Sequence, residues 1–180
     1  MATTEVAAKG SPGAARGVDF DVVIVGAGIA GIHQLHALRG RGLSVRVFEA
    51  GTGVGGTWYW NRYPMARFDS ESYSYGYFFS KELLEDWEWS EHFAAQPETE
   101  RYLNHVVDRF GLSDDIQLRT RVESVVFDEE ANRWTLRTSD GTTTTARFVI
   151  AATGLRSAPF FPDIPGKDTF RGEKIGRAHV

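Results

Sequence analysis

A glycine-rich segment, GAGIAG at residues 26–31, constrains the fold of this chain more than any other feature. It follows DVVIV, a continuous apolar run of mostly β-branched residues, which is typical of a strand buried on both faces of a parallel sheet. Residues 29–39 then carry apolar side chains at helical spacing, and SVRVFE at residues 44–49 alternates as a strand does. The segment therefore predicts strand, helix and parallel strand in about 30 residues, which is a βαβ unit.

A glycine turn between a buried strand and a helix is a site for the pyrophosphate of a dinucleotide. Gly26 allows the tight turn, Gly28 lets the pyrophosphate approach the backbone at the helix N-terminus, and Gly31 permits close packing of helix on strand. Glu49 lies eighteen residues after the third glycine, where its carboxylate can accept hydrogen bonds from ribose hydroxyls. The alternative is a glycine turn that binds nothing, and the glycines alone do not distinguish NAD from FAD.

The rest of the chain indicates a second kind of sheet. Residues 98–110 form an amphipathic helical pattern that follows Pro97. From Gln117 the period is two, and three segments predict an antiparallel meander with an Asp140-Gly141 hairpin turn: 121–127, 133–138 and 142–148. FVIAATG at 148–154 predicts another buried strand, whose small terminal residues mark either the passage of a cofactor or only the end of a strand. Residues 50–80 lack a period and predict a functional loop region.

Composition excludes several classes of function. With 20 Lys and Arg against 24 Asp and Glu, the net charge of −4 offers no basic surface for nucleic acid or an anionic membrane. The absence of cysteine excludes disulfides, iron–sulfur clusters and thiolate zinc sites, and we expect a cytoplasmic protein. His33 and His36 share a helix face without a third ligand, so no metal site is expected and they are interpreted as packing or surface residues. Trp87 and Trp89 are likewise interpreted mainly as packing residues.

A second glycine pair identifies the type of cofactor by resemblance. Gly55-Gly56 is followed by Thr57-Trp58 in GGTWYWNRYP, and D-x-x-S-x-x-Y follows at residues 69–75. This segment resembles the Baeyer–Villiger monooxygenases, flavoproteins that bind FAD and NADPH and insert an oxygen atom beside a ketone carbonyl. The resemblance runs from Phe20 to about Glu173. EDWEWS and the FAAQPE that follows it are similar to members that act on cyclic ketones with bulky substituents.

The resemblance implies a set of cofactor contacts. FAD contacts are implied at Gly26, Gly28, Gly31, Glu49, Gly56, Thr57, Trp58, Asp69, Tyr75 and the backbone of Val122. Arg67 to Asp69 lie where the family brings nicotinamide near the flavin. Asp69 has only a supporting catalytic role, the orientation of a catalytic arginine beyond residue 180, and its alternative role is to cap a loop. Met65 and Phe68 depart from the smaller residues usual at their positions, so we expect them to alter the pocket wall.

These observations predict an α/β fold with a Rossmann-like FAD-binding domain, in which a parallel sheet with a βαβ unit is joined to an antiparallel β-meander. Relative to flavoproteins with two dinucleotide-binding domains, it is incomplete. We expect a disordered tail at 1–18, the N-terminal part of the FAD-binding domain at 19–173 and a non-native tail at 174–180. The family fingerprint F-x-G-x-x-x-H-x-x-x-W begins at Phe170, but Gly176 and Val180 occupy its histidine and tryptophan positions.

The implied function is an FAD- and NADPH-dependent monooxygenase that converts a ketone to an ester or lactone, present as a fragment that is inactive alone. The partners expected are a small-molecule ketone and molecular oxygen, with no nucleic acid and no membrane. The alternatives are an N-hydroxylating or S/N-oxygenating flavin monooxygenase and a non-catalytic FAD-binding fragment. The sequence does not indicate the ketone, its regiochemistry or the oligomeric state.

Overall fold

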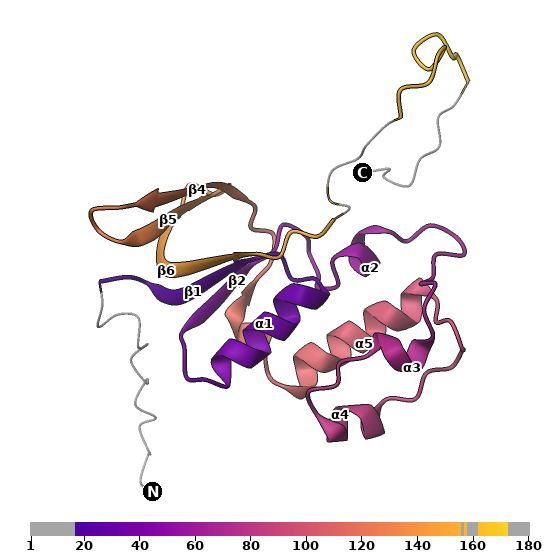
Figure 1. Ribbon diagram of the computed structural model, residues 1–180, viewed down its shortest axis with the longest axis horizontal. Coiled ribbons are helices and arrows are strands. Elements are labelled where there is room, and N and C mark those ends of the chain that lie inside the picture. The colour runs from indigo at the N-terminus through magenta and orange to yellow at the C-terminus, as the bar shows by residue number, and fades with distance from the viewer. Residues whose placement is uncertain (1–16, 156, 158–161, 173–180) are drawn as a thin grey trace, which may run out of the picture.

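Parallel strands and the helix that joins two of them occupy the centre of the structure (Figure 1). The computed structural model describes residues 17–155, 157 and 162–172. Strand β1 (Phe20–Val25) pairs in parallel with β2 (Val45–Phe48), and helix α1 (Ile29–Arg39) connects them. The predicted βαβ unit is confirmed, and the helix has the predicted bounds.

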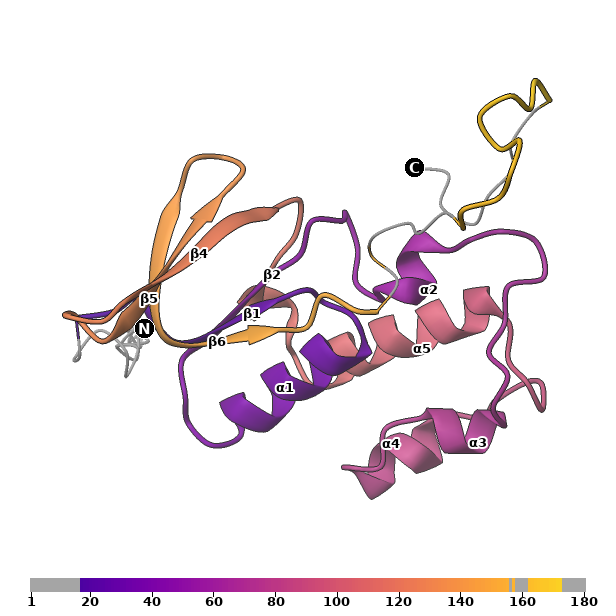
Figure 2. The ribbon, with the colours of Figure 1, turned by 45° about the horizontal axis from the view of Figure 1, so that its top comes forward.

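The six strands of the described residues belong to one mixed sheet with the order β3-β2-β1-β6-β5-β4. Strand β3 (Ile116–Gln117) pairs in parallel with β2, and β6 (Thr143–Ala151) pairs in parallel with β1. Strands β4 (Val122–Asp128) and β5 (Arg133–Thr138) extend the sheet in the antiparallel direction. Figure 2 shows this antiparallel arm twisting away from the parallel strands. The predicted fold class, a parallel βαβ sheet joined to an antiparallel meander, is confirmed.

One strand joins the two parts of the sheet, where the sequence predicted two strands. The segments 142–148 and 148–154 contribute to the single strand β6, in which Ala146 pairs both with Trp134 of β5 and with Phe20 of β1. The prediction of a strand buried on both faces is wrong at Phe148, which is 54% exposed. Phe148 pairs with Val22 and lies on the face of the sheet that α1 covers. Because α1 lies over β1 and β2, it leaves Phe148 on β6 exposed.

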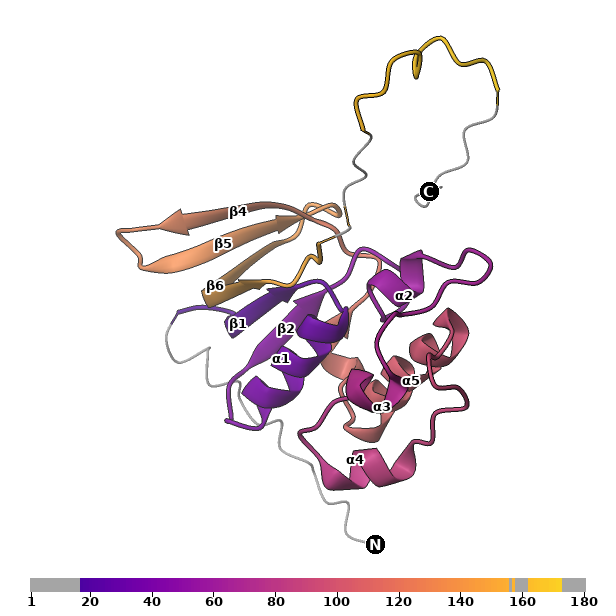
Figure 3. The ribbon, with the colours of Figure 1, turned by 45° about the vertical axis from the view of Figure 1, so that its right-hand side comes forward.

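The remaining helices gather beside α1 (Figure 3). They are α2 (Thr57–Trp60), α3 (Ser72–Tyr75), α4 (Lys81–Asp86) and α5 (Gln96–Arg109), and a 3₁₀ turn covers Ser113–Asp115. Helix α5 confirms the predicted amphipathic helix and starts two residues earlier than expected, with Pro97 in its first turn. The aperiodic segment 50–80 contains α2 and α3, which are too short to leave a periodic pattern.

The apolar core lies mainly between the sheet and the helices. Its largest cluster joins one face of β1 and β2 to the inner faces of α1, α4 and α5, and includes Val22, Ile24, Ile32, Leu35, Val47, Leu83, Leu103 and Val106. Burial of each such side chain contributes about 1.5–3 kcal/mol. A smaller cluster on the other face of the sheet includes Val23, Phe48, Leu136 and Ala146. The helices that lie beside α1 are therefore part of the main core.

The structure describes the two ends of the chain only in part. The predicted tail at 1–18 and the predicted non-native segment at 174–180 fall largely or wholly outside the described residues. Residues 162–172 form a stretch with turns that stands apart from the sheet and helices (Figure 1). This stretch contains the start of the family fingerprint. No helix in the described part of the chain is long and apolar enough to span a membrane.

A buried carboxylate joins β1 to the middle of β6 and to the residue before β2. Asp21 of β1 is 2% exposed, and its carboxylate accepts hydrogen bonds from the backbone and hydroxyl of Ser44 at 3.0 and 2.9 Å and from Arg147 of β6 at 2.8 Å. Burial by itself raises the pKa of Asp21, but the hydrogen bonds from Arg147 and Ser44 outweigh it and hold the pKa below its ordinary value. The ionised carboxylate therefore stabilises the native register of β1, β2 and β6.

We expect Asp21→Asn to lower the free energy of unfolding by about 1–3 kcal/mol at neutral pH, because Arg147 and Ser44 lose a charged acceptor. The stabilisation is present above the ordinary carboxyl pKa of about 4 and is lost as the pH falls through the lower native value, so the gap between wild type and variant narrows in acid. Urea denaturation at several pH values measures this gap.

Asp19→Asn is the matched control, because Asp19 is exposed and its carboxylate accepts hydrogen bonds from Thr145 of β6, which is uncharged. An equal loss of unfolding free energy for both variants, or a loss for Asp21→Asn that grows in acid, would contradict the stabilising role of the Asp21 carboxylate.

Candidate dinucleotide-binding site

The first glycine turn packs too closely for side chains at two of its positions. Gly26 has φ +104°, and a Cβ there would lie 2.6 Å from the carbonyl oxygen of Ala152. A Cβ at Gly31 would lie 1.9 Å from the carbonyl oxygen of Gly26. The roles expected for these glycines, a tight turn and close packing of the helix on the strand, agree with this geometry.

The first turn of α1 offers unpaired donors beside that glycine turn. Gly28 is the N-cap residue of α1, no side chain caps the helix, and its first turn carries no acidic residue. The backbone N–H groups of a helix start lack partners within the helix, and the helix dipole places positive potential there. These two properties together favour an anion such as a pyrophosphate.

The second glycine pair lies directly against the first turn. The backbone N–H of Gly55 donates to the carbonyl oxygen of Ala27 at 2.9 Å. A Cβ at Gly56 would lie 2.8 Å from the Cα of Gly28, and both Gly55 and Gly56 have positive φ, +130° and +55°. Two motifs that are 28 residues apart in the sequence therefore form one side-chain-free backbone surface at the N-terminus of α1.

Glu49 holds this surface together. It is 6% exposed, Oε2 accepts from the backbone N–H of Ala27 at 2.7 Å, and Oε1 accepts from that of Gly51 at 2.7 Å. Because each oxygen of a carboxylate can accept two hydrogen bonds, one position on each oxygen is left for a ribose hydroxyl. The sequence indicated the position of Glu49, but not that its carboxylate also orders the glycine turn.

The segment that precedes β4 runs beside Glu49. Arg119 and Thr120 donate backbone hydrogen bonds, both of 2.8 Å, to the carbonyl oxygens of Gly51 and Glu49. Val122, half-buried, opens β4 two residues later. Sequence reasoning did not find Arg119 and Thr120, because nothing local indicates the pairing that brings them to β2.

Aromatic side chains form the wall behind α2. Trp58 is buried, and its indole N–H donates to the hydroxyl of Tyr75 at 2.8 Å. Phe68 stacks on Tyr75 with ring centroids 4.0 Å apart and contacts Trp58 edge-on. Burial raises the pKa of Tyr75, so its hydroxyl stays protonated. Phe68 is 6% exposed and lies inside this cluster, and its effect on the pocket wall stays a prediction.

Met65 stands in a turn that favours glycine. The backbone N–H of Ala66 donates to the carbonyl oxygen of Tyr63 at 3.1 Å, with Pro64 second in the turn and Met65 third at φ +67°. Pro followed by a residue of positive φ is the pattern of a type II turn. The side chain of Met65 is 82% exposed, so it projects outward from this turn.

Arg67 and Asp69 differ in the hydrogen bonds that their side chains make. Arg67 is exposed, and its guanidinium contacts the carboxylate of Glu91 at 2.9 Å and the carbonyl oxygen of Phe93 at 2.7 Å. Asp69 is also exposed, and within the described part of the chain its carboxylate accepts no hydrogen bond. The alternative in which Asp69 caps a loop is therefore not observed, and its carboxylate is available to a partner.

The two histidines of α1 are packing residues in this structure. The His36 ring stacks on Phe79 at 4.1 Å and meets Phe110 edge-on at 4.6 Å, and His33 contacts Phe79 at 5.7 Å. Burial, with His33 and Arg39 nearby, lowers the pKa of His36. Among residues 17–155, 157 and 162–172, no group of three or more His, Asp or Glu side chains is placed to hold a metal ion.

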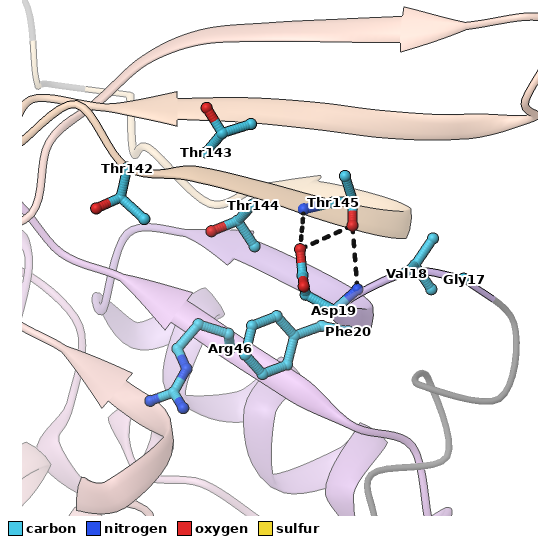
Figure 4. Close-up of a pocket in the computed structure, with 9 residues that line it drawn as sticks. All are labelled: Gly17, Val18, Asp19, Phe20, Arg46, Thr142, Thr143, Thr144 and Thr145. Atoms are coloured by element: carbon cyan, nitrogen blue, oxygen red, sulfur yellow. Dashed lines mark hydrogen bonds between the residues drawn. The ribbon is translucent and has the colours of Figure 1, made fainter.

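An open groove lies at the opposite ends of the strands (Figure 4). Its volume is about 780 Å³, and it is lined by Gly17–Phe20, Arg46 and Thr142–Thr145. The Asp19 carboxylate there is already bonded to the backbone and hydroxyl of Thr145, both at 2.7 Å. Ligands of open α/β sheets bind at the carboxyl ends of the strands, whereas this groove is at the amino ends of β1 and β6. The glycine surface is therefore the better candidate site.

Comparison with known proteins relates this site to flavoenzymes. The sequence profile of the family described as "Pyridine nucleotide-disulphide oxidoreductase" matches residues 23–176. The chain is 50% identical over 159 residues to "Acetone monooxygenase (methyl acetate-forming)" of Gordonia sp. (strain TY-5), which covers 88% of this chain and 30% of that protein. It is 52% identical over 157 residues to "Phenazine N-monooxygenase PhzNO1" of Lysobacter antibioticus, covering 87% of this chain and 29% of the relative.

A solved structure agrees with these matches. The crystal structure of "OTEMO complex with FAD and NADP" superposes with a TM-score of 0.78 at 45% identity, over 87% of this chain and 30% of that one. The chain is also 41% identical over 157 residues to a "Baeyer-Villiger monooxygenase" of Pseudooceanicola batsensis, over 87% of this chain and 29% of the relative. The resemblance to Baeyer–Villiger monooxygenases is thereby confirmed. The chain spans about 30% of the length of the first two curated relatives.

We expect Gly31→Ala to lower the free energy of unfolding by about 3 kcal/mol or more, because the added methyl group cannot fit against the carbonyl of Gly26. Helix propensity alone would favour alanine by about 1 kcal/mol, so the sign of the change separates the two effects. Urea denaturation of both proteins measures it.

Gly40→Ala is the matched control at the other end of α1. Gly40 has ordinary helical dihedrals, and a Cβ there would meet its nearest atom at 3.4 Å. We expect its stability to change by less than about 1 kcal/mol. Equal losses for the two variants would refute the close-packing role of Gly31.

Proposed function

Since the chain belongs to the pyridine nucleotide-disulphide oxidoreductase family, we propose that it is the FAD-binding part of a monooxygenase that uses FAD and NADPH to convert a ketone to an ester or lactone. The observation that carries the proposal is the contact of Gly28 with Gly56, which leaves bare backbone beside a helix N-terminus. A relative with 50% identity is named for the conversion of acetone to methyl acetate. A structural neighbour with 45% identity contains FAD and NADP.

Each part of the site has a proposed role. The start of α1, with Gly26, Gly28, Gly31 and Gly56, binds the pyrophosphate, and Glu49 accepts hydrogen bonds from a ribose. The backbone of Val122 lies on the adenine side, because its strand approaches the chain beside Glu49. Thr57, Trp58, Asp69 and Tyr75 lie toward the flavin, and Arg67 toward the nicotinamide.

The residues of the chain act by binding and orientation. Bound FAD would supply the redox chemistry that activates oxygen for transfer to the ketone. The side-chain-free backbone surface fits FAD, because a Cβ at Gly56 would clash with Gly28 and because the first turn of α1 has N–H donors without partners in the helix. The indole of Trp58 is fixed by Tyr75, and the free carboxylate of Asp69 is suited to orient an arginine supplied by another part of the whole protein.

Oxygenation of a ring nitrogen is the second candidate activity. A relative with 52% identity over the same region is named phenazine N-monooxygenase. Both chemistries use the same kind of FAD site, so the residues of this chain do not separate them. Because the chain spans about 30% of the length of these relatives, we propose that it is inactive by itself. A cytoplasmic location and the absence of nucleic-acid and membrane partners stay predictions from composition.

We expect Gly28→Val to abolish FAD binding by the whole protein, because Gly28 already lies against Gly56 and a branched side chain there would cover the backbone N–H groups at the start of α1. The measurement is the ratio of flavin to protein after purification, read from the visible absorbance. Gly40→Ala, at the far end of α1, should keep the wild-type ratio. Full flavin occupancy in Gly28→Val would show that the pyrophosphate binds elsewhere.

We expect the whole protein to transfer one atom of labelled oxygen into an ester or lactone when it is supplied with NADPH, ¹⁸O₂ and acyclic or cyclic ketones. A parallel reaction with phenazine tests N-oxygenation, and lysine and ornithine test N-hydroxylation of amines. Mass spectrometry identifies the products. An N-oxide or hydroxylamine without any labelled ester would favour the second activity and contradict the first.

A further inference from the structure

Tyr77 joins the first turn of α1 to α5. Its hydroxyl donates a hydrogen bond of 2.6 Å to the carbonyl oxygen of Ile29, the first residue of α1. Its backbone N–H donates at 2.7 Å to the hydroxyl of Tyr102 on α5. Both contacts span long stretches of sequence, 48 and 25 residues, so neither follows from local structure. Tyr77 thus ties the helix start to a separate helix.

The environment of Tyr77 keeps its hydroxyl a proton donor. The residue is 8% exposed, and the ring of His33, one turn along α1, stacks on it at 6.0 Å. Phe79 packs on it at 5.2 Å and Tyr102 at 6.1 Å. Burial raises the pKa of Tyr77 well above its ordinary value, so the phenol stays neutral across the physiological range. A buried neutral phenol needs an acceptor, and the described acceptor is the carbonyl of Ile29.

The same short segment holds the second glycine motif. Tyr75, two residues before Tyr77, accepts the indole N–H of Trp58 from α2 at 2.8 Å. Gly56, the N-cap residue of α2, lies against Gly28, the N-cap residue of α1. Tyr75 and Tyr77 therefore connect both helix starts that form the bare backbone surface, one through an indole and the other through a helix carbonyl.

We infer that Tyr77 is a positioning residue of the pyrophosphate site, which fixes the first turn of α1 against the segment that anchors Trp58. The inference rests on the proposed FAD site, because the turn that Tyr77 holds is the turn proposed to bind the pyrophosphate. Tyr77 acts on this turn through the backbone and does not bind the cofactor itself. Its loss should leave the site present but less well aligned, since donors must be preorganised to bind tightly.

The test compares FAD binding by the whole apoprotein in three forms: wild type, Tyr77→Phe and Tyr102→Phe. Tyr77→Phe keeps the ring in the core and removes only the bond to Ile29. Tyr102→Phe is matched in burial, at 3% exposed, and removes the hydroxyl that accepts from the backbone N–H of Tyr77 while leaving the bond from Tyr77 to Ile29 in place. Titration calorimetry gives the dissociation constants, and ³¹P NMR of bound FAD reports on the pyrophosphate. Thermal melting of each apoprotein measures the cost to stability alone.

For Tyr77→Phe we expect the dissociation constant of FAD to rise by about 3- to 10-fold, the loss of one hydrogen bond, and the ³¹P resonances of bound FAD to shift. For Tyr102→Phe we expect a lower melting temperature with a nearly unchanged dissociation constant and unchanged resonances. If Tyr77→Phe lowers only the melting temperature, or if Tyr102→Phe weakens FAD binding equally, the inference is overturned.

Failure of the inference can be distinguished from failure of the proposed function. If the wild-type protein binds FAD and Gly28→Val does not, the proposed site stands whatever the result for Tyr77. If the wild-type protein binds no FAD, the proposed function fails and the inference fails with it.

Discussion

The close contact of α1 with the end of β1 is the constraint on which the rest of the structure depends. Gly31 lies so near the carbonyl of Gly26 that no side chain fits between them, and Gly26 also lies against Ala152 at the end of β6. This contact fixes the start of α1 against the carboxyl ends of β1 and β6. It also brings Gly28 within reach of Gly56, so close packing and the bare surface for a pyrophosphate have the same origin.

A second level of organisation keeps that surface in one shape. Glu49 joins Ala27 to Gly51 through its two carboxylate oxygens, and Gly55 donates to Ala27. Tyr77 holds the first residue of α1 from the side of the helices. The turn is thus restrained by the strand that follows it and by the helical layer, which suits a site whose donors must be aligned before the ligand arrives.

Much of the fold could be predicted from the sequence where the pattern is local. The run from Phe20 to Arg39 gave a strand and a helix at their observed bounds, because burial on both faces and helical spacing leave a direct trace. The division of β6 into two strands was wrong, because its two halves pair with different partners and so show different periods. Contacts such as Thr120 with Glu49 and Tyr77 with Ile29 depend on tertiary packing and leave no periodic signal.

Binding of the FAD pyrophosphate at the start of α1 is best tested by a crystal structure of the whole protein with FAD, because it locates the two phosphate groups relative to α1. We expect both phosphates to lie against the N–H groups at the start of α1, beside the contact of Gly28 with Gly56, with a ribose hydroxyl on Glu49. A cofactor bound at the other ends of the strands, in the groove of Gly17–Phe20 and Thr142–Thr145, would contradict this assignment of the site.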